Sequence, residues 1–204
     1  MLKLKTSINN SYKISALIFD LDGTLVDSNL NFSEIKSQLG CPEEVDLLEY
    51  VERLPLKLKQ EAIDYIQSHE LADAKTSRWL PWAKEFVSNI KAINIPMAIV
   101  TRNYSSAAAL KVKNNEIPID LIITREDAPP KPNPTALLDI AKSWVINPNE
   151  ILYVGDYLYD VQAAINANMH SCLYSPSAQQ DYQHLASINV ECLSELWSHL
   201  SEDH

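Results

Sequence analysis

Cysteine is scarce in this sequence: Cys41, Cys172 and Cys192 are the three in a chain of 204 residues. An odd number of widely spaced cysteines predicts neither a disulfide framework nor a pair of thiolate metal ligands. The first thirteen residues contain no long apolar segment, so no secretory signal is expected there. These absences favour a reduced, cytoplasmic setting.

Basic residues are outnumbered by acidic ones, 17 to 27, which gives a formal net charge of −10 and a pI near 4.9. Because no run of Lys or Arg is present, we expect neither nucleic acid nor an anionic membrane as a partner. Long apolar runs are missing too, since none approaches the roughly 18 residues that a membrane-spanning helix needs. The sequence leaves the oligomeric state open.

Short apolar segments recur along the chain and predict buried strands: "ISALIF" (14–19), "PMAIV" (96–100), "DLIIT" (120–124) and "EILYVG" (150–155). Helical periodicities separate them, such as Trp82, Phe86, Ile90 and Ile93 on one face. A further strand after His170 and a helix near residues 192–200 are expected. This alternation predicts an α/β fold, a three-layer Rossmann-like core with a parallel sheet between two layers of helices.

The stretch from 29 to 80 interrupts this alternation, because its pattern is helical throughout. Pro42 is expected to open one helix, and Leu58, Ala62 and Ile66 lie on one face of another. We therefore predict a small α-helical cap at 29–80, inserted after the first strand. The catalytic core would then comprise residues 1–28 and 81–204.

Polar residues follow each predicted strand. In an open parallel sheet, ligands bind beyond the carboxyl ends of the strands, so these side chains are expected to converge. Several closely spaced carboxylates repel one another unless a cation lies between them, and hard oxygen ligands suit Mg²⁺. The residues expected at this edge are Asp20, Asp22, Thr101, Lys131, Asp156 and Asp160.

Four motifs, "DLDGTLVDS", "VTRN", "KPNP" and "GDYLYD", occur in this order at the ends of the predicted strands. With them the chain resembles the haloacid dehalogenase superfamily from about Ile14 to Leu173. Most closely it resembles the phosphatase branch with a helical cap after the first motif, which includes phosphoglycolate phosphatases. Glycine is scarce as well, with three in the chain. Two of them, Gly23 and Gly155, fall inside these motifs, where tight turns need them.

The resemblance implies a Mg²⁺-dependent phosphatase that acts on a small phosphorylated metabolite, such as phosphoglycolate or a sugar phosphate. Asp20 would be the nucleophile that forms an aspartyl-phosphate, and Asp22 the general acid and base. Mg²⁺ would be held by Asp20, Asp156 and the backbone carbonyl of Asp22. Asp160 would support Lys131 or a metal-bound water. The residues expected to bind the phosphate ester are Thr101, Arg102, Asn103 and Lys131.

Two alternatives stay open at this point. A phosphosugar mutase of the same superfamily would share every core residue. The other is a non-catalytic phosphate-binding or signalling module. A receiver domain also places acids, a threonine and a lysine on a parallel sheet, but its phosphate-accepting aspartate lies near the middle of a shorter chain, so the spacing here does not fit that type of module. Tyr157 and Tyr159 depart from the smaller side chains common in the fourth motif. Candidates for a substrate-gripping cation on the cap are Arg53, Lys57, Lys59 and Arg78.

Overall fold

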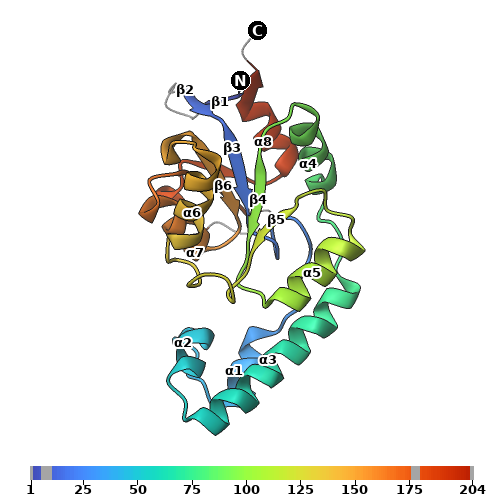
Figure 1. Cartoon of the computed structure of the whole chain (residues 1–204), viewed down its shortest axis with the longest axis vertical. Coiled ribbons are helices and arrows are strands. Elements are labelled where there is room, and N and C mark those ends of the chain that lie inside the picture. Colours follow the sequence, from blue (N-terminus) through green and yellow to red (C-terminus); the bar gives the residue numbers. More distant parts are fainter. Residues whose placement is uncertain (1, 6–10, 176–179, 203–204) are drawn as a thin grey trace.

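The computed structural model describes residues 2–5, 11–175 and 180–202. Its centre is a six-stranded parallel sheet in the order β5-β4-β3-β6-β7-β8 (Figure 1). All four predicted strands are present, and the strand expected after His170 is confirmed. The strand bounds are β3 Ala16–Phe19, β4 Met97–Val100, β5 Leu121–Ile123, β6 Ile151–Gly155, β7 His170–Tyr174 and β8 Ile188–Val190.

Alternate residues of β3 enter two separate hydrophobic clusters, one on each face of the sheet. Leu17 and Phe19 join the cluster that contains α4 and α8, whereas Ala16 and Ile18 join the cluster that contains α6 and α7. This period of two is what a strand buried on both faces requires. The three-layer α/β fold predicted from the sequence is therefore confirmed. The helices of the core are α4 Ala83–Ala92, α5 Ser105–Asn114, α6 Thr135–Trp144, α7 Leu158–Asn166 and α8 Leu193–His199.

The strand predicted from Ile14 begins two residues later, because Ile14 belongs to a second, antiparallel sheet. There it pairs with Leu2, and the strand order is β2-β1-β9. This small sheet joins the two ends of the described chain. Its strands are β1 Leu2–Lys5, β2 Ser11–Ile14 and β9 Leu200–Glu202; two single-turn 3₁₀ helices, η1 Pro148–Glu150 and η2 Gln183–Leu185, complete the core.

Residues 29–80 fold into three helices beside the sheet: α1 Phe32–Leu39, α2 Leu47–Glu52 and α3 Leu56–Thr76 (Figure 1). We call this segment the cap. It has a hydrophobic cluster of its own, and the second half of α3 packs against α5 through Ala74 and Ala107. The exact limits of the cap at 29 and 80 stay a prediction.

The expectation that Pro42 opens a helix is wrong. Residues 42–46 form a turn, and α2 begins at Leu47. The reason lies in Asp46, whose carboxylate accepts hydrogen bonds from the backbone N–H groups of Leu48 and Glu49 at 3.0 and 3.2 Å. It thereby satisfies donors that the first turn of a helix leaves unpaired. Across the part of the chain that is described, no helix is long and apolar enough to cross a membrane.

Candidate active site

A cavity of about 560 Å³ lies between the carboxyl edge of the sheet and the cap. The strand order reverses between β3 and β6, and such a switch point is where open α/β sheets bind ligands. All eight residues that the sequence predicted for the site line this cavity, together with ten residues of the cap. The eight are Asp20, Asp22, Thr101, Arg102, Asn103, Lys131, Asp156 and Asp160.

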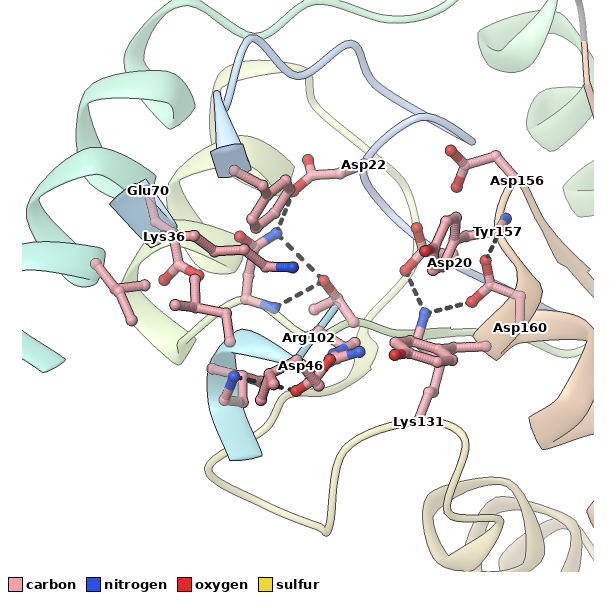
Figure 2. A pocket seen from close by; sticks show the side chains of 18 of the residues that line it. Asp20, Asp22, Lys36, Asp46, Glu70, Arg102, Lys131, Asp156, Tyr157 and Asp160 are labelled. Atoms are coloured by element: carbon pink, nitrogen blue, oxygen red, sulfur yellow. Dashed lines mark hydrogen bonds and ion pairs between the residues drawn. The ribbon is translucent and has the colours of Figure 1, made fainter. Parts of the chain in front are cut away.

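Lys131 lies between two carboxylates at the bottom of the cavity (Figure 2). Its ammonium nitrogen donates to Asp20 Oδ1 at 2.5 Å, to Asp160 Oδ1 at 2.6 Å and to the Tyr153 hydroxyl at 2.9 Å. Burial alone lowers the pKa of Lys131, but Asp160 and Asp20 outweigh it and raise that pKa. The lysine is therefore a fixed positive charge beside Asp20.

Tyr153 was missed by the sequence reasoning. Its hydroxyl accepts from Lys131 and lies 3.2 Å from both the Val100 carbonyl and Asp160 Oδ1, so it can donate to either. The residue is completely buried on β6. A tyrosine inside an apolar strand could have indicated such a role, because a buried hydroxyl needs a partner.

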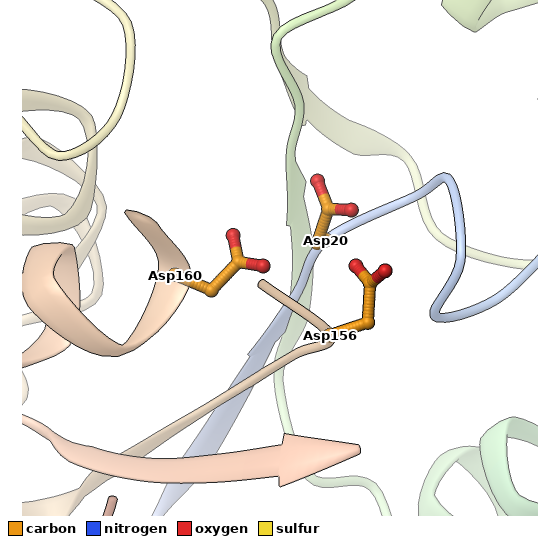
Figure 3. Close-up of side chains that lie close together, drawn as sticks. All are labelled: Asp20, Asp156 and Asp160. Atoms are coloured by element: carbon orange, nitrogen blue, oxygen red, sulfur yellow. The ribbon is translucent and has the colours of Figure 1, made fainter. Parts of the chain in front are cut away.

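Three carboxylates, those of Asp20, Asp156 and Asp160, lie together at this point (Figure 3). One oxygen of each lies within 4.8 Å of one oxygen of each of the others. Burial, reinforced by neighbouring carboxylates, raises the pKa of Asp20 to about 7 and that of Asp156 to about 8. The repulsion between the ionised carboxylates is relieved when a divalent cation binds between their oxygens. The donor set therefore fits a hard metal ion such as Mg²⁺.

The three acids differ in how much of their hydrogen-bonding capacity is already used. Asp160 Oδ1 accepts from Lys131, and its Oδ2 accepts from the backbone N–H of Tyr157 at 3.0 Å, which also caps α7. Asp156, by contrast, accepts a long hydrogen bond of 3.4 Å from the Thr24 hydroxyl, and no other side chain of the described residues donates to it. Asp20 and Asp156 are thus better suited than Asp160 to direct metal coordination.

Gly23 allows the first motif to approach Asp156. Its φ is +75°, and a Cβ built on it would lie 2.3 Å from Asp156 Oδ2, closer than any side-chain contact permits. The glycine is needed both for its left-handed backbone and for the space beside the carboxylate. This explains why one of only three glycines in the chain stands here.

Asp22 faces the cavity from the same turn and is held by two donors. Asn103 Nδ2 donates to Asp22 Oδ2 at 2.6 Å, and Lys111 Nζ donates to Asp22 Oδ1 at 2.5 Å. Burial raises the pKa of Asp22, although these two donors act against the shift. Asn103 also contacts the Thr101 hydroxyl through its backbone N–H and its amide, at 3.1 and 3.2 Å.

Lys111 was not predicted. A signal was available, because Lys111 follows Ala107 and Ala108 at helical spacing and so shares their buried face of α5. Lys111 lies ten residues beyond Thr101, outside the residues that immediately follow each strand, and so was not among the predicted site residues.

Among the described residues, three ion pairs join the cap to the core, and in each the acid comes from the cap. Arg102 Nη2 lies 2.8 and 2.7 Å from the two oxygens of Asp46 (Figure 2). Although burial opposes it, the Arg102 guanidinium lowers the pKa of Asp46. Arg102 therefore lines the cavity as expected, but it is engaged with the cap; a direct role in substrate binding stays a prediction. The other two pairs are Glu70 with Arg125 and Asp73 with Lys111.

None of the four cap cations proposed from the sequence lines the cavity. Arg53 pairs with Glu49, and Lys59 pairs with Glu52, on the surface of the cap. The cap cation that does line it is Lys36 of α1, which points into the cavity and donates to the Glu43 carbonyl at 2.5 Å (Figure 2). Tyr157 and Tyr159 also line the cavity, and their rings meet edge to face.

Comparison with known proteins decides the family. The model of the haloacid dehalogenase-like hydrolases matches residues 17–174, which is most of the chain. This chain belongs to the haloacid dehalogenase-like hydrolases. It is 30% identical to an uncharacterised hydrolase of Saccharomyces cerevisiae, over 90% of this chain and 89% of that protein. The resemblance inferred from the four motifs is thereby confirmed, and the protein is an enzyme of this family.

One further relative and one solved structure are similar to this haloacid dehalogenase-like chain. A phosphoglycolate phosphatase of Vibrio vulnificus is 28% identical, over 78% of this chain and 82% of that protein. The crystal structure of a hydrolase from Pseudomonas syringae superposes with a TM-score of 0.76 at 22% identity, and covers 91% of this chain and 97% of that one. At that identity the structural match concerns the fold alone.

Proposed function

We propose that this hydrolase is a Mg²⁺-dependent phosphatase that acts on a small phosphorylated metabolite through an aspartyl-phosphate on Asp20. The observation that carries the proposal is the placement of Asp20. It lies at the switch point of the sheet, bonded to Lys131 and beside Asp156, with Asp22 facing the same cavity. The relatives that are named phosphoglycolate phosphatases support a phosphate ester as the substrate.

In the first step an oxygen of Asp20 attacks phosphorus, and the bond from phosphorus to the ester oxygen breaks. Asp22 gives its proton to that leaving oxygen, so the alcohol departs neutral. The Lys131 ammonium, with the Thr101 hydroxyl, would stabilise the negative charge on the phosphoryl oxygens. The raised pKa of Asp22 agrees with its role as the acid.

In the second step Asp22 takes a proton from a water molecule, whose oxygen attacks the phosphorus of the aspartyl-phosphate. The bond to Asp20 breaks, and inorganic phosphate leaves. Asp20, Asp156 and the backbone carbonyl of Asp22 would hold Mg²⁺, which when bound supplies positive charge near the phosphoryl group. Asp160 would keep Lys131 oriented.

The cap would exclude bulk water during both steps. It contributes ten of the residues that line the cavity, including Phe32, Leu48 and Ile66, and so closes the side opposite the sheet. The cavity volume of about 560 Å³ suits a small metabolite rather than a macromolecule. Lys36 gives the cap one cation at the cavity with which to contact a polar group of such a substrate.

The test is release of inorganic phosphate from a panel of esters, including phosphoglycolate and several sugar phosphates, with Mg²⁺ or with a chelator. We expect release only with the metal, and a loss of roughly 10³-fold or more in kcat for Asp20→Asn. Asp139→Asn is the matched control, because Asp139 is an exposed residue of α6 outside the cavity. Equal release by wild type and Asp20→Asn would contradict the proposal.

The same panel separates the two alternatives. A phosphosugar mutase would convert one sugar phosphate into its isomer without releasing phosphate, which product analysis detects. A non-catalytic binding module would bind Mg²⁺ and phosphate esters, yet change none of them.

A further inference from the structure

Lys111 is the least expected charge in the described structure, because it is fully buried on α5, with 0% of the residue exposed. A buried ammonium group costs several kcal/mol of solvation unless it is paired. Lys111 has two carboxylate partners, Asp22 Oδ1 at 2.5 Å and Asp73 Oδ2 at 2.6 Å. One partner belongs to the first motif of the core, and the other belongs to the cap.

Lys111 and Asn103 together hold both oxygens of the Asp22 carboxylate. Lys111 donates to Asp22 Oδ1, and Asn103 donates to Asp22 Oδ2 at 2.6 Å, so each oxygen is held by a different donor. A side-chain carboxylate with one anchor can rotate about its χ angles, whereas two anchors on opposite oxygens define a single orientation. Lys111 is fully buried and is not among the residues that line the cavity, so it would act through Asp22 rather than by contact with the substrate.

Asp73 links this arrangement to the cap. Its Oδ1 accepts from the backbone N–H of Asn29 at 2.7 Å, and its Oδ2 accepts from the Ser28 hydroxyl at 3.1 Å as well as from Lys111. The chain passes from the first motif into the cap at residues 28 and 29. Asp73 lies near the end of α3, shortly before the chain returns from the cap to the core. One carboxylate thus ties both connections of the cap to Lys111.

We propose that Lys111 is a positioning residue that orients Asp22 for proton transfer, and that Asp73 of the cap holds Lys111 in place. Seating the cap against α5 would then complete the arrangement of the acid–base group. The inference rests on the proposed phosphatase function, since it concerns the proton that Asp22 gives to the leaving oxygen.

The leaving group provides a test that a merely structural role would not pass. An alkyl phosphate such as glycerol phosphate needs a proton on its leaving oxygen, whereas p-nitrophenyl phosphate releases a stable phenolate without one. The value of kcat/KM reports the steps up to the first irreversible one, here formation of the aspartyl-phosphate and loss of the alcohol. Comparing kcat/KM for the two esters therefore isolates the contribution of Asp22 as an acid.

For Lys111→Met we expect kcat/KM to fall about 100-fold for the alkyl ester and only a few-fold for p-nitrophenyl phosphate. Lys111→Arg, which keeps a cation, is expected to recover part of the loss. Asp73→Asn should show a smaller loss with the same preference for the aryl ester. The matched control is Lys113→Met, because Lys113 is an exposed residue of the same helix.

An equal loss on both esters, or no loss on either, would overturn the positioning role of Lys111. If Lys111→Met fails to give a native circular dichroism spectrum, Asp73→Asn decides by the same ratio of kcat/KM values. Wild-type protein that hydrolyses neither these two esters nor any ester of the panel above would instead overturn the phosphatase proposal and this role with it. If the wild type is active and the variants keep its ratio of kcat/KM values for the two esters, the inference about Lys111 alone is contradicted.

Discussion

At the scale of single residues, the candidate site depends on side chains held by more than one partner. Asp20 is bonded to Lys131, which in turn is held by Asp160 and Tyr153. Asp22 is held from two sides, and the Thr101 hydroxyl contacts Asn103. No buried side-chain nitrogen or oxygen in the described chain lacks a hydrogen-bond partner. Such arrangements fix the geometry of a site before substrate binds.

Gly23 offers a test of that geometry. Gly23→Ala would force a Cβ to within 2.3 Å of Asp156 Oδ2, so the carboxylate must shift from its present position beside Asp20. We expect the affinity for Mg²⁺, measured by calorimetry, to fall about tenfold or more, since displaced metal-site residues cost about 10- to 100-fold. Gly40→Ala is the matched control: its φ of +69° imposes a similar backbone penalty, but its nearest contact is Tyr50 at 3.7 Å. Wild-type Mg²⁺ affinity in Gly23→Ala would contradict this explanation.

At the scale of secondary-structure elements, the notable feature is how the cap is attached. The cap supplies Asp46, Glu70 and Asp73, and the core supplies the matching cations from α5 and from the loops after β4 and β5. Apolar contacts between α3 and α5 add to these pairs. Charge pairs need a defined geometry, so they favour one seated position of the cap over a continuum of positions.

The pair of Glu70 and Arg125 can be tested directly. Arg125 Nη1 and Nη2 lie 2.5 and 2.9 Å from the two Glu70 oxygens, and both side chains are largely buried. Arg125→Met would leave the Glu70 carboxylate buried without its partner, which costs about 3–5 kcal/mol of unfolding free energy. Urea denaturation at pH 7 measures this loss.

Two variants control the Arg125 experiment. Adding Glu70→Leu to Arg125→Met removes the stranded charge and is expected to restore most of the stability. Arg53→Met breaks an exposed pair with Glu49 inside the cap, and such pairs contribute at most about 1 kcal/mol. If Arg125→Met costs no more than Arg53→Met, the buried pair does not hold the cap.

At the scale of the whole molecule, the acidic site couples folding to metal binding. In the absence of metal, the pKa of Asp20 is about 7 and that of Asp156 about 8, whereas both are near 3.8 in the unfolded chain. Between about pH 4 and pH 8 the folded protein therefore binds more protons at these groups than the unfolded chain. By linkage, their contribution to stability falls as the pH rises through this window.

We therefore expect Mg²⁺ to stabilise the protein more at pH 7.5 than at pH 5.5, because the metal binds the ionised carboxylates. The measurement is the change in Tm on adding Mg²⁺ to chelator-treated protein at both pH values. Asp156→Asn is the reference variant. Subtracting its shift in Tm from that of wild type removes the contribution of other groups that titrate in this pH range, such as His170, whose pKa is lowered by burial. An equal shift in Tm at the two pH values in wild type would contradict the coupling.

The sequence alone determined the sheet and the residues at its edge. A strand that is buried on both faces carries apolar side chains at successive positions, so a short apolar run in the sequence predicts such a strand. Parallel strands bring the residues that follow them to one edge of the sheet. Asp20, Asp22, Thr101, Lys131 and Asp156 could be placed at one site on that basis. The roles assigned to them follow from the resemblance and await the experiments above.

The tertiary structure decided what depends on contacts between distant segments. Lys111 and Asp73 are 38 residues apart, and they pair because α3 packs on α5; Lys111 also pairs with Asp22, which lies 89 residues away in the chain. The start of α2 at Leu47 was set by the Asp46 side chain, which also binds Arg102, rather than by the preference of Pro42 for a first helical turn. Local patterns report burial and helical or strand periodicity, but they do not report which charge meets which, because that is settled by packing across the whole chain.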